Sequence, residues 1–408
     1  MDITTAHVYS DNRTQEEQDE AKVSIIGENT DVKCTGSAYL TKKDPFAYND
    51  DNIVFKGGTA IDFFNGNDWM RFVNREDFDF TPAANLDSGD TLEYGKDYYI
   101  YLCFDGNTPQ LVVSKNATYP SGYTALTSRK IGFFHYGAVR KVSDDGKWIP
   151  VDSNGIKFGA TGTVWQQNVT KGVIPNSIGD LKNKPAVFMP GMAKVGRIWM
   201  CIYQMSQAEP ITFMATTNGL HVQTGALKSS YGAIPVTGTE GCNQYNFVEL
   251  AGIQGMRLPH YSEWLHGAFG TPQGQDGSNS YGWTKTTNTA RTYTGCSVDT
   301  GTGEYSIAGE KPYAVSANNL VDCAGNVWEW QEDYTMRQDT TLSWTWYNVL
   351  GANMGQAYLP NSLGLSALLC GGNWAHGVHC GPRCVLLTDY PWYVHPSIGA
   401  RFACDSAA

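Results

Sequence analysis

The chain has 408 residues and a mass of 44.8 kDa, which exceeds one ordinary hydrophobic core and predicts two or three domains. Hydrophobic residues make up 41% and charged residues 17%, which excludes a disordered chain. The 44 Gly, 23 Tyr and 12 Trp favour a loop-rich, β-rich protein over a helical bundle. A formal net charge of -11 argues against a nucleic-acid partner, because phosphates would be repelled.

Membrane, secretion and disulfide signals are weak. No apolar run reaches the roughly 20 residues of a membrane helix, so we expect no membrane insertion. The N-terminus lacks the basic and apolar stretches of a signal peptide, which predicts synthesis in a cytoplasm without standard secretion. The 10 cysteines are irregularly spaced, with Cys380 and Cys384 the close pair, and this favours buried free thiols over a disulfide scaffold.

The N-terminal part changes character along the chain. Residues 1–30 are polar and acidic and predict a tail or an attachment segment. Short runs from Lys33 to Tyr136 then alternate Val, Ile, Tyr and Phe with polar residues, and turn residues bound them about every ten positions. This pattern predicts an all-β sandwich domain over residues 31–150, and a turn-rich stretch, residues 142–159, predicts a linker.

The third part, residues 160–408, contains the clearest helical signals. NFVELAGIQG (246–255) places apolar residues on one helix face and ends at Gly252 or Gly255. HYSEWLHGAF (260–269) predicts a second short helix with Trp264, Leu265, Ala268 and Phe269 apolar. Long loops rich in Trp and Gly follow Gly270, and loops of that length are usually functional, so we expect the site there.

Three phrases in this part carry a family resemblance: GMRLPHYSEW (255–264), DCAGNVWEW (322–330) and CGGNW…IGAR (370–401). In this order they resemble the C-type-lectin-like fold shared by formylglycine-generating enzymes and the variable proteins of diversity-generating retroelements. Within the second group the chain is similar to the phage major tropism determinants. KDYYIYLCFDG (96–106) looks like their middle β-sandwich, and GGNW…GARFACD (371–405) looks like their variable segment.

The resemblance implies an α+β, β-rich fold in which a C-type-lectin-like domain follows a β-sandwich. It implies a non-enzymatic protein for receptor binding, tropism and adhesion, made in a host cytoplasm and carried in the virion at a phage tail-fibre tip. The implied partners are a host surface receptor, protein or glycan, other tail components and two further copies in a homotrimer. The N-terminal prism of that family is not recognisable in residues 1–30.

The segment from Gly371 to Arg401 contains no Lys, Glu, Gln or Met. In the resembled variable proteins, adenines of mostly AAC codons are randomised, so a varied position carries a residue encoded by NNC, which excludes those four and Trp. Trp374 and Trp392 are therefore expected to be scaffold. The resemblance, with the face described next, predicts these ligand-binding residues: Asn373, Ala375, His376, Gly377, His379, Leu386, Thr388, Asp389, Tyr390, Tyr393, His395 and Ser397.

An extended backbone would place Asn373, Ala375, Gly377 and His379 on one exposed face. Trp374, Val378 and Cys380 would then point inward, and His376 breaks the alternation although the family pattern counts it as varied. A mixture of His, Tyr, Asp and Thr on a rigid frame is typical of antibody binding loops. We therefore interpret this segment as a displayed binding surface.

We expect scaffold roles for four residues of the three phrases. Trp328 and Trp330 lie two apart and predict core packing on one face of an extended segment. Arg257 and Arg401 flank apolar residues, and buried arginines need carboxylates or carbonyls, so we interpret both as structural clamps. No cofactor is required, although Asn326 and Glu329 could ligate a structural Ca²⁺.

Other functions remain open at this point. A formylglycine-generating-type oxidase would need a thiol soon after the aromatic of GG-x-W, where this chain has His376. The set His376, His379, Cys380 and Cys384 could instead bind zinc. A static lectin-like adhesin without displayed specificity is the remaining alternative.

Overall fold

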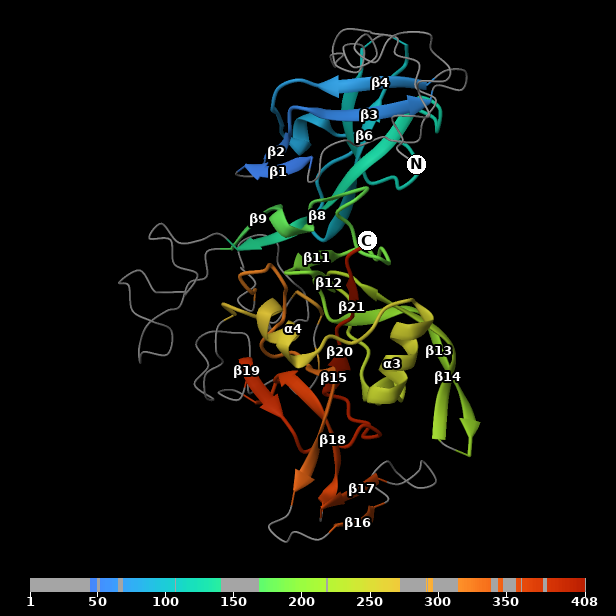
Figure 1. The fold of residues 1–408 in the computed structure, drawn as a ribbon, viewed down its shortest axis with the longest axis vertical. Coiled ribbons are helices and arrows are strands. Elements are labelled where there is room, and N and C mark those ends of the chain that lie inside the picture. The colour runs from blue at the N-terminus through green and yellow to red at the C-terminus, as the bar shows by residue number, and fades with distance from the viewer. Residues whose placement is uncertain are drawn as a thin grey trace, which may run out of the picture. The chain divides into compact units, whose positions relative to one another are not determined.

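The computed structural model describes residues 45–49, 52–64, 69–106, 108–140, 169–217, 219–271, 291, 293–295, 315–338, 344–347, 357–360, 362–376 and 380–407. The expected tail and linker lie outside these residues. Two compact units divide the chain: Met1–Gly137 with Gly172–Lys184 and Ala407–Ala408, and Ala138–Lys171 with Pro185–Ser406. Figure 1 shows the elements of each unit.

The first unit is all β, as the alternating runs predict. A three-stranded antiparallel sheet has the order β1 (Phe46–Asn49), β2 (Asn52–Phe55), β5 (Phe78–Phe80), and β3 (Thr59–Phe64) pairs with β4 (Trp69–Asn74). The larger sheet consists of β10 (Gly179–Asp180), β8 (Ser128–Arg140), β6 (Lys96–Cys103) and β7 (Gln110–Ser114), with β9 (Val169–Val173) on β8. The remaining regular elements are short 3-10 helices, η1 (Pro82–Asn85) and η2 (Pro175–Ser177).

Residues 172–184 belong to this first unit, whereas the sequence assigns them to a C-terminal domain that starts at residue 160. The reason is strand pairing, because Gly179 and Asp180 pair with Phe133 and Gly132 of β8. The division between the units therefore does not follow a single point in the chain.

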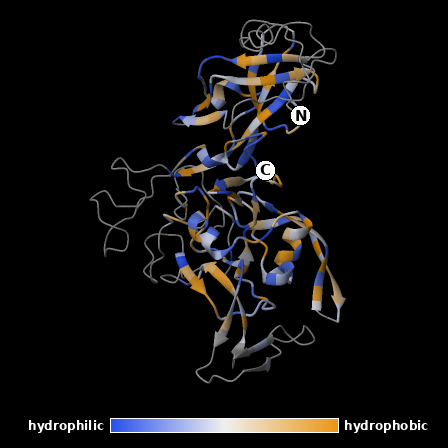
Figure 2. Cartoon of the chain, in the orientation of Figure 1, coloured by the Kyte–Doolittle hydropathy of each residue, from blue (hydrophilic) through white to orange (hydrophobic). Residues whose placement is uncertain are grey.

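Strand β6 departs from the alternation of apolar and polar residues, because both of its faces are apolar. Tyr98, Ile100 and Leu102 are buried in the main core, whereas Tyr99, Tyr101 and Cys103 are buried in a second cluster on the opposite face. Figure 2 shows hydrophobic and hydrophilic residues alternating along strands of this unit. Strand β6 is therefore covered on both faces, and it lies between β8 and β7 in its sheet.

The second unit contains several small sheets and the helices. Its four-stranded sheet has the order β19 (Gly381–Leu386), β18 (Ser362–Gly371), β15 (Trp328–Gln338), β20 (Ile398–Ala400). A three-stranded sheet has the order β11 (Met192–Val195), β12 (Ile198–Cys201), β21 (Ala403–Asp405). Two hairpins are β13 (Met205–Thr216) with β14 (Gly219–Ser229), and β16 (Trp344–Tyr347) with β17 (Ala357–Pro360). GNVWEW and GGNW are thus neighbours, because Glu329 pairs with Cys370 across β15 and β18.

Both predicted helices are confirmed, as α3 (Gln244–Ile253) and α4 (Tyr261–Gly267). Asn243 caps α3 through a capping box with Asn246, and Gly255 follows its end at a φ of 70°. Phe269, expected on the apolar helix face, lies beyond the end of α4 and is exposed. Within the described residues, no helix combines the length and apolarity needed to cross a membrane.

Helix α3 supplies partners to one edge of the β13–β14 hairpin. Asn246 and Glu249 hydrogen-bond to backbone groups of β14, and the Gln254 amide both accepts from Leu227 N (2.9 Å) and donates to Leu227 O (2.8 Å). An isolated hairpin is marginally stable in water. The hydrogen bonds from α3 take the place of those that a third strand would make. The helix thereby joins the hairpin to the body of the unit.

Candidate functional site

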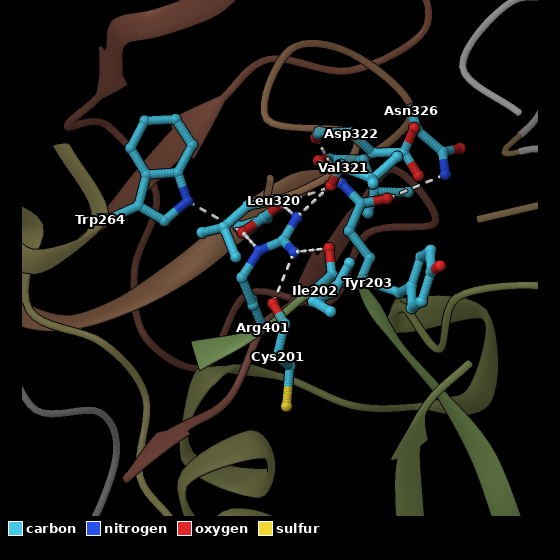
Figure 3. Close-up of polar contacts among 12 residues, drawn as sticks. Cys201, Ile202, Tyr203, Trp264, Leu320, Val321, Asp322, Asn326 and Arg401 are labelled. Carbon is cyan, nitrogen blue, oxygen red and sulfur yellow. Dashed lines mark hydrogen bonds and ion pairs between the residues drawn. The ribbon is translucent and has the colours of Figure 1, made fainter. Parts of the chain in front are cut away.

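A buried ion pair lies at the centre of the second unit. Arg401, fully buried at the end of the IGAR phrase, binds Glu329 of β15 in a bidentate pair with Nε···Oε2 at 3.0 Å and Nη2···Oε1 at 2.8 Å. Its remaining N–H groups donate to backbone carbonyls of Cys201, Ile202 and Val321 (Figure 3). The expectation that Arg401 is a structural clamp is confirmed.

The electrostatics of this pair explain why it persists in the interior. Burial by itself would lower the pKa of Arg401, but the Glu329 carboxylate outweighs that effect and the pKa is raised above its ordinary value. Trp264 Nε1 (2.9 Å) and Gln204 Nε2 (3.1 Å) also donate to Glu329. A buried pair with this many partners avoids the cost of an uncompensated charge.

This arrangement does not fit a calcium site at Asn326 and Glu329. Donors from Arg401, Trp264 and Gln204 occupy the two Glu329 oxygens, and the Asn326 amide donates to Gln204 Oε1 at 2.8 Å. Calcium needs several free oxygen ligands, and the arginine supplies competing positive charge.

The other expected scaffold residues differ in burial. Trp264, Trp328 and Trp330 are buried, whereas Trp374 is half-buried. Arg257 is partly exposed and pairs with Glu263 (2.7 Å) and Asp405, so it clamps the surface rather than the core.

The GGNW phrase forms a tight turn rather than an extended segment. Gly371 and Gly372 both have positive φ, at 91° and 85°, and a Cβ on Gly372 would collide with Cys380. Asn373 then closes the turn, because its side chain accepts from Ala375 N (2.9 Å) and its carbonyl accepts from His376 N (3.3 Å). The two glycines are therefore required by the backbone itself.

The turn contradicts the prediction that exposed and inward-pointing residues alternate in this segment. Asn373 is 5% exposed and serves the turn, while Ala375 and His376 are adjacent and both exposed. A turn places consecutive side chains on the solvent side, which removes the apparent irregularity at His376. Gly377 and His379 lie outside the described residues.

The segment 386–397 has its backbone held at several points. The Asp389 carbonyl accepts from Ala367 N of β18, and the Pro391 carbonyl accepts from Gln244 N at the start of α3. The His395 carbonyl accepts from Gly238 N of the short helix η3 (Gly238–Glu240). Backbone hydrogen bonds to sheet and helices therefore position this segment, whatever its side chains are.

The predicted binding residues of this segment divide by exposure. Thr388 and Tyr393 are exposed, while Leu386, Asp389, Tyr390 and His395 are half-buried. Two ring stacks stiffen the segment, Tyr390 on Trp392 (5.0 Å) and Tyr393 on His395 (5.6 Å). Ser397 is 3% exposed and hydrogen-bonds to His395 Nδ1, so its side chain faces the frame and not solvent.

Of the described residues between Gly371 and Arg401, four exposed ones lie outside the predicted set: Arg383, Leu387, Val394 and Pro396. The prediction selects residue types expected at varied positions and does not select residues by exposure. The Leu386–Leu387 pair at the end of β19 carries the one available signal, because consecutive strand residues face opposite sides.

A pocket of about 460 Å³ lies beside this surface and is lined by Trp328, His376, Arg383, Cys384, Val385 and Leu386. Trp328 Nε1 donates to His376 Nδ1 at 2.9 Å, which ties the exposed turn to the buried end of β15. The pocket thus combines scaffold residues with His376 and Leu386, two of the predicted binding residues.

The thiols near this pocket do not occupy the oxidase position, which is His376. The expected zinc set includes His379, which lies outside the described residues. Cys380 is buried, donates to the Asn373 carbonyl at 3.0 Å, and has its pKa raised mainly by burial. Cys384 is half-buried in the pocket wall. No cluster of three or more His, Cys, Asp or Glu suited to a metal occurs in the described part of the chain, which omits His379.

Comparisons with known proteins match both units. The model of the Mtd second domain matches residues 45–166, and the model of the sulfatase-modifying factor enzyme 1-like domain matches residues 176–405. A tail fiber receptor-binding protein of Bordetella phage BPP-1 is 27% identical over 327 residues, which cover 77% of this chain and 72% of that protein.

Solved structures of the Major Tropism Determinant share the fold. Its M1 and I1 variants match with TM-scores of 0.61 and 0.62 at 23% and 24% identity, each over 90% of this chain and 85% of the other. The fold class is therefore α+β and β-rich, with a C-type-lectin-like domain after a β domain, as the sequence predicts. Since the second family model covers more than half of the 408 residues, the chain belongs to the sulfatase-modifying factor enzyme 1-like family.

Proposed function

We propose that this chain is a non-enzymatic receptor-binding protein of a phage tail fibre, and that it sets host tropism by binding a cell-surface receptor. The observation that carries the proposal is the segment 386–397, whose backbone is held by the frame while Thr388 and Tyr393 point to solvent. The receptor-binding name of the Bordetella phage relative supports the same function. Residues exposed on a fixed backbone can be exchanged without unfolding the domain.

The proposed binding residues comprise the exposed or half-buried members of the predicted set. Asn373 and Ser397 are omitted because both are buried and serve the backbone. The proposed surface consists of Ala375, His376, Leu386, Thr388, Asp389, Tyr390, Tyr393 and His395. Gly377 and His379, which lie outside the described residues, stay in the proposed set. Retroelement-driven variation at these positions is part of the proposal, and it requires a nearby reverse transcriptase gene and a near-copy of codons 371–401 that differs at adenines.

The position and burial of the thiols support the part of the proposal that excludes the oxidase activity. The oxidase needs a reactive thiol soon after the aromatic of the GG-x-W turn, and this position is His376, whose Nδ1 accepts a hydrogen bond from Trp328. The buried Cys380 has a raised pKa, which keeps it protonated and unreactive.

We propose that the chain forms a homotrimer and that this trimer binds other tail components. A small site of mixed small and aromatic residues binds weakly, and linked sites raise apparent affinity by about 10²–10⁴. Light scattering on the purified chain checks this, and a monomer at micromolar concentration would contradict an intrinsic trimer.

Cell binding tests the function directly. Fluorescently labelled protein is incubated with a panel of bacterial strains, and bound fluorescence is measured by flow cytometry. We expect binding to a subset of strains that a Thr388→Ala/Tyr393→Ala double variant loses although it remains folded, as a thermal melt checks. The matched control is Leu126→Ala, an exposed residue of the first unit. Equal binding by all three proteins would contradict the proposed site.

A further inference from the structure

Arg383 differs from the other arginines around the binding surface. Arg257, Arg291 and Arg401 each bind a carboxylate, of Glu263, Glu240 and Glu329 respectively. Arg383 is exposed, and within the described part of the chain no carboxylate lies within ion-pair distance of it. Within the described residues, Arg383 therefore forms no ion pair that would stabilise the domain as those three arginines do.

The position of Arg383 in the chain is equally distinctive. Between Gly371 and Ala400 it is the one cationic residue apart from histidine, in a chain whose net charge is -11. It belongs to β19, the edge strand of the four-stranded sheet, and lies outside the predicted varied positions. The binding surface thus has a fixed cation beside residues that are expected to change.

The pocket that Arg383 lines has mostly apolar walls. The walls of the pocket include Val385, Leu386 and Trp328, and the indole N–H of Trp328 is already used by His376. An ionic contact is stronger where apolar walls exclude water than on an open surface. The guanidinium fork also matches the two oxygens of a carboxylate.

We propose that this pocket is a constant anchoring subsite that receives a glutamate or aspartate side chain of a protein receptor against Arg383. The apolar walls contact the methylene stem, and Arg383 binds the carboxylate. A sugar acid fits less well, because its several hydroxyls would meet Val385 and Leu386 and lose hydrogen bonds to water. This inference rests on the proposed function, since it assigns a chemistry to part of the same surface.

Cys384 provides a readout that does not require the receptor. It is the half-buried thiol of the pocket wall, and the seven other described cysteines are buried. Cys34 and Cys296 lie outside the described residues and are replaced by Ser in every variant. The rate of modification of Cys384 by neutral 4,4'-dithiodipyridine is then measured in the full chain, with and without added ligand.

Three probes separate the possible ligands: acetyl-Gly-Glu-Gly-amide, its Gln counterpart and glucuronic acid, each at millimolar concentration. We expect the Glu peptide to slow modification of Cys384 by about two- to fivefold, which corresponds to peptide at about one to four times its Kd. The Gln peptide should have no effect, and Arg383→Gln should abolish the protection. The matched control is Arg197→Gln, an exposed arginine in the turn between β11 and β12, which should retain it.

Several outcomes overturn the proposal. An acidic side chain is contradicted as the occupant if the Gln and Glu peptides protect Cys384 equally. It is also contradicted if the Glu peptide still protects Cys384 in Arg383→Gln, or if glucuronic acid alone protects it. Absence of protection by any probe contradicts the subsite itself.

Cell binding separates this inference from the proposed function. Arg383→Gln should weaken binding to every recognised strain, whereas varied positions change which strains are recognised. If Arg383→Gln binds like the wild type while the Thr388/Tyr393 variant fails, the anchoring subsite is wrong and the function stands. If neither variant changes binding, both the proposed surface and the subsite are wrong, and absence of binding to any strain by the wild type would contradict the function itself.

Discussion

The buried centre around Arg401 and the segment 386–397 lie close together in the chain but use opposite kinds of contact. In the centre, side chains such as Glu329 and Trp264 make the essential contacts. In the segment, the backbone makes them, at Asp389, Pro391 and His395. Backbone contacts do not depend on which side chain is present. The segment can therefore accept substitutions, whereas substitutions of the buried side chains around Arg401 would destabilise the domain.

The largest expected effect is at the buried ion pair. Arg401→Met should lower the free energy of unfolding by about 3–5 kcal/mol, because it leaves the Glu329 carboxylate buried without its cation. Chemical denaturation measures the loss. Arg257→Met is the matched control and should cost far less, since 26% of that side chain is exposed. Equal losses of unfolding free energy in the two variants would contradict a larger stabilising role for the buried pair.

The buried tryptophans should follow. Trp264→Ala should cost about 3–5 kcal/mol through the cavity that it leaves, and it also removes a donor to Glu329. Trp374→Ala, from the same variable-segment turn that carries exposed residues, should cost less because Trp374 is half-buried. Denaturation midpoints of the two variants decide this order. The reverse order would place Trp374 in the frame.

The glycine turn gives a smaller, conformational effect. Gly372→Ala should destabilise by about 1–3 kcal/mol, because its φ is 85° and the new Cβ would meet Cys380. Gly252→Ala in α3 is the control, with open space around its Cβ, and should stabilise by about 0.5–1 kcal/mol. Thermal melts of both variants provide the measurement. A neutral Gly372→Ala would contradict the strained turn.

The smallest effects are expected on the surface itself. Thr388→Ala should change the free energy of unfolding by no more than about 0.5 kcal/mol, because its side chain is exposed. Tyr393→Ala should cost no more than about 1.5 kcal/mol, because it also loses the ring stack on His395. Ser397→Val, at a buried neighbour that bonds to His395, should cost more. Losses above 2 kcal/mol at Thr388 would show that the segment is part of the core.

Local chemistry made several features predictable from sequence. The short runs of Val, Ile, Tyr and Phe between turn residues identify the strands of the first unit, although burial of both faces of β6 was not predicted. Capping residues and glycines mark the ends of α3, and the need of a buried arginine for partners identifies Arg401 as a clamp. Each of these signals is contained within a few residues.

Exposure within the variable segment was not predictable in the same way. An alternating face would expose Asn373, but the Asn373 side chain closes the turn after two glycines of positive φ and is buried. Ser397 belongs to the residue types expected at varied positions, yet its hydroxyl hydrogen-bonds to His395 and the residue is buried. Residue type carries no information on which side of the backbone a side chain lies.

The sequence by itself determined the β-rich class, the two helices, the clamp at Arg401 and the segment in which binding residues are to be sought. Only the tertiary structure decided which side chains of that segment reach solvent, and that Arg383 faces a pocket beside Trp328 and His376. The physical reason is distance along the chain. Arg401 meets Glu329, 72 residues earlier, and the segment meets β18 and α3, so only the folded chain brings these partners together.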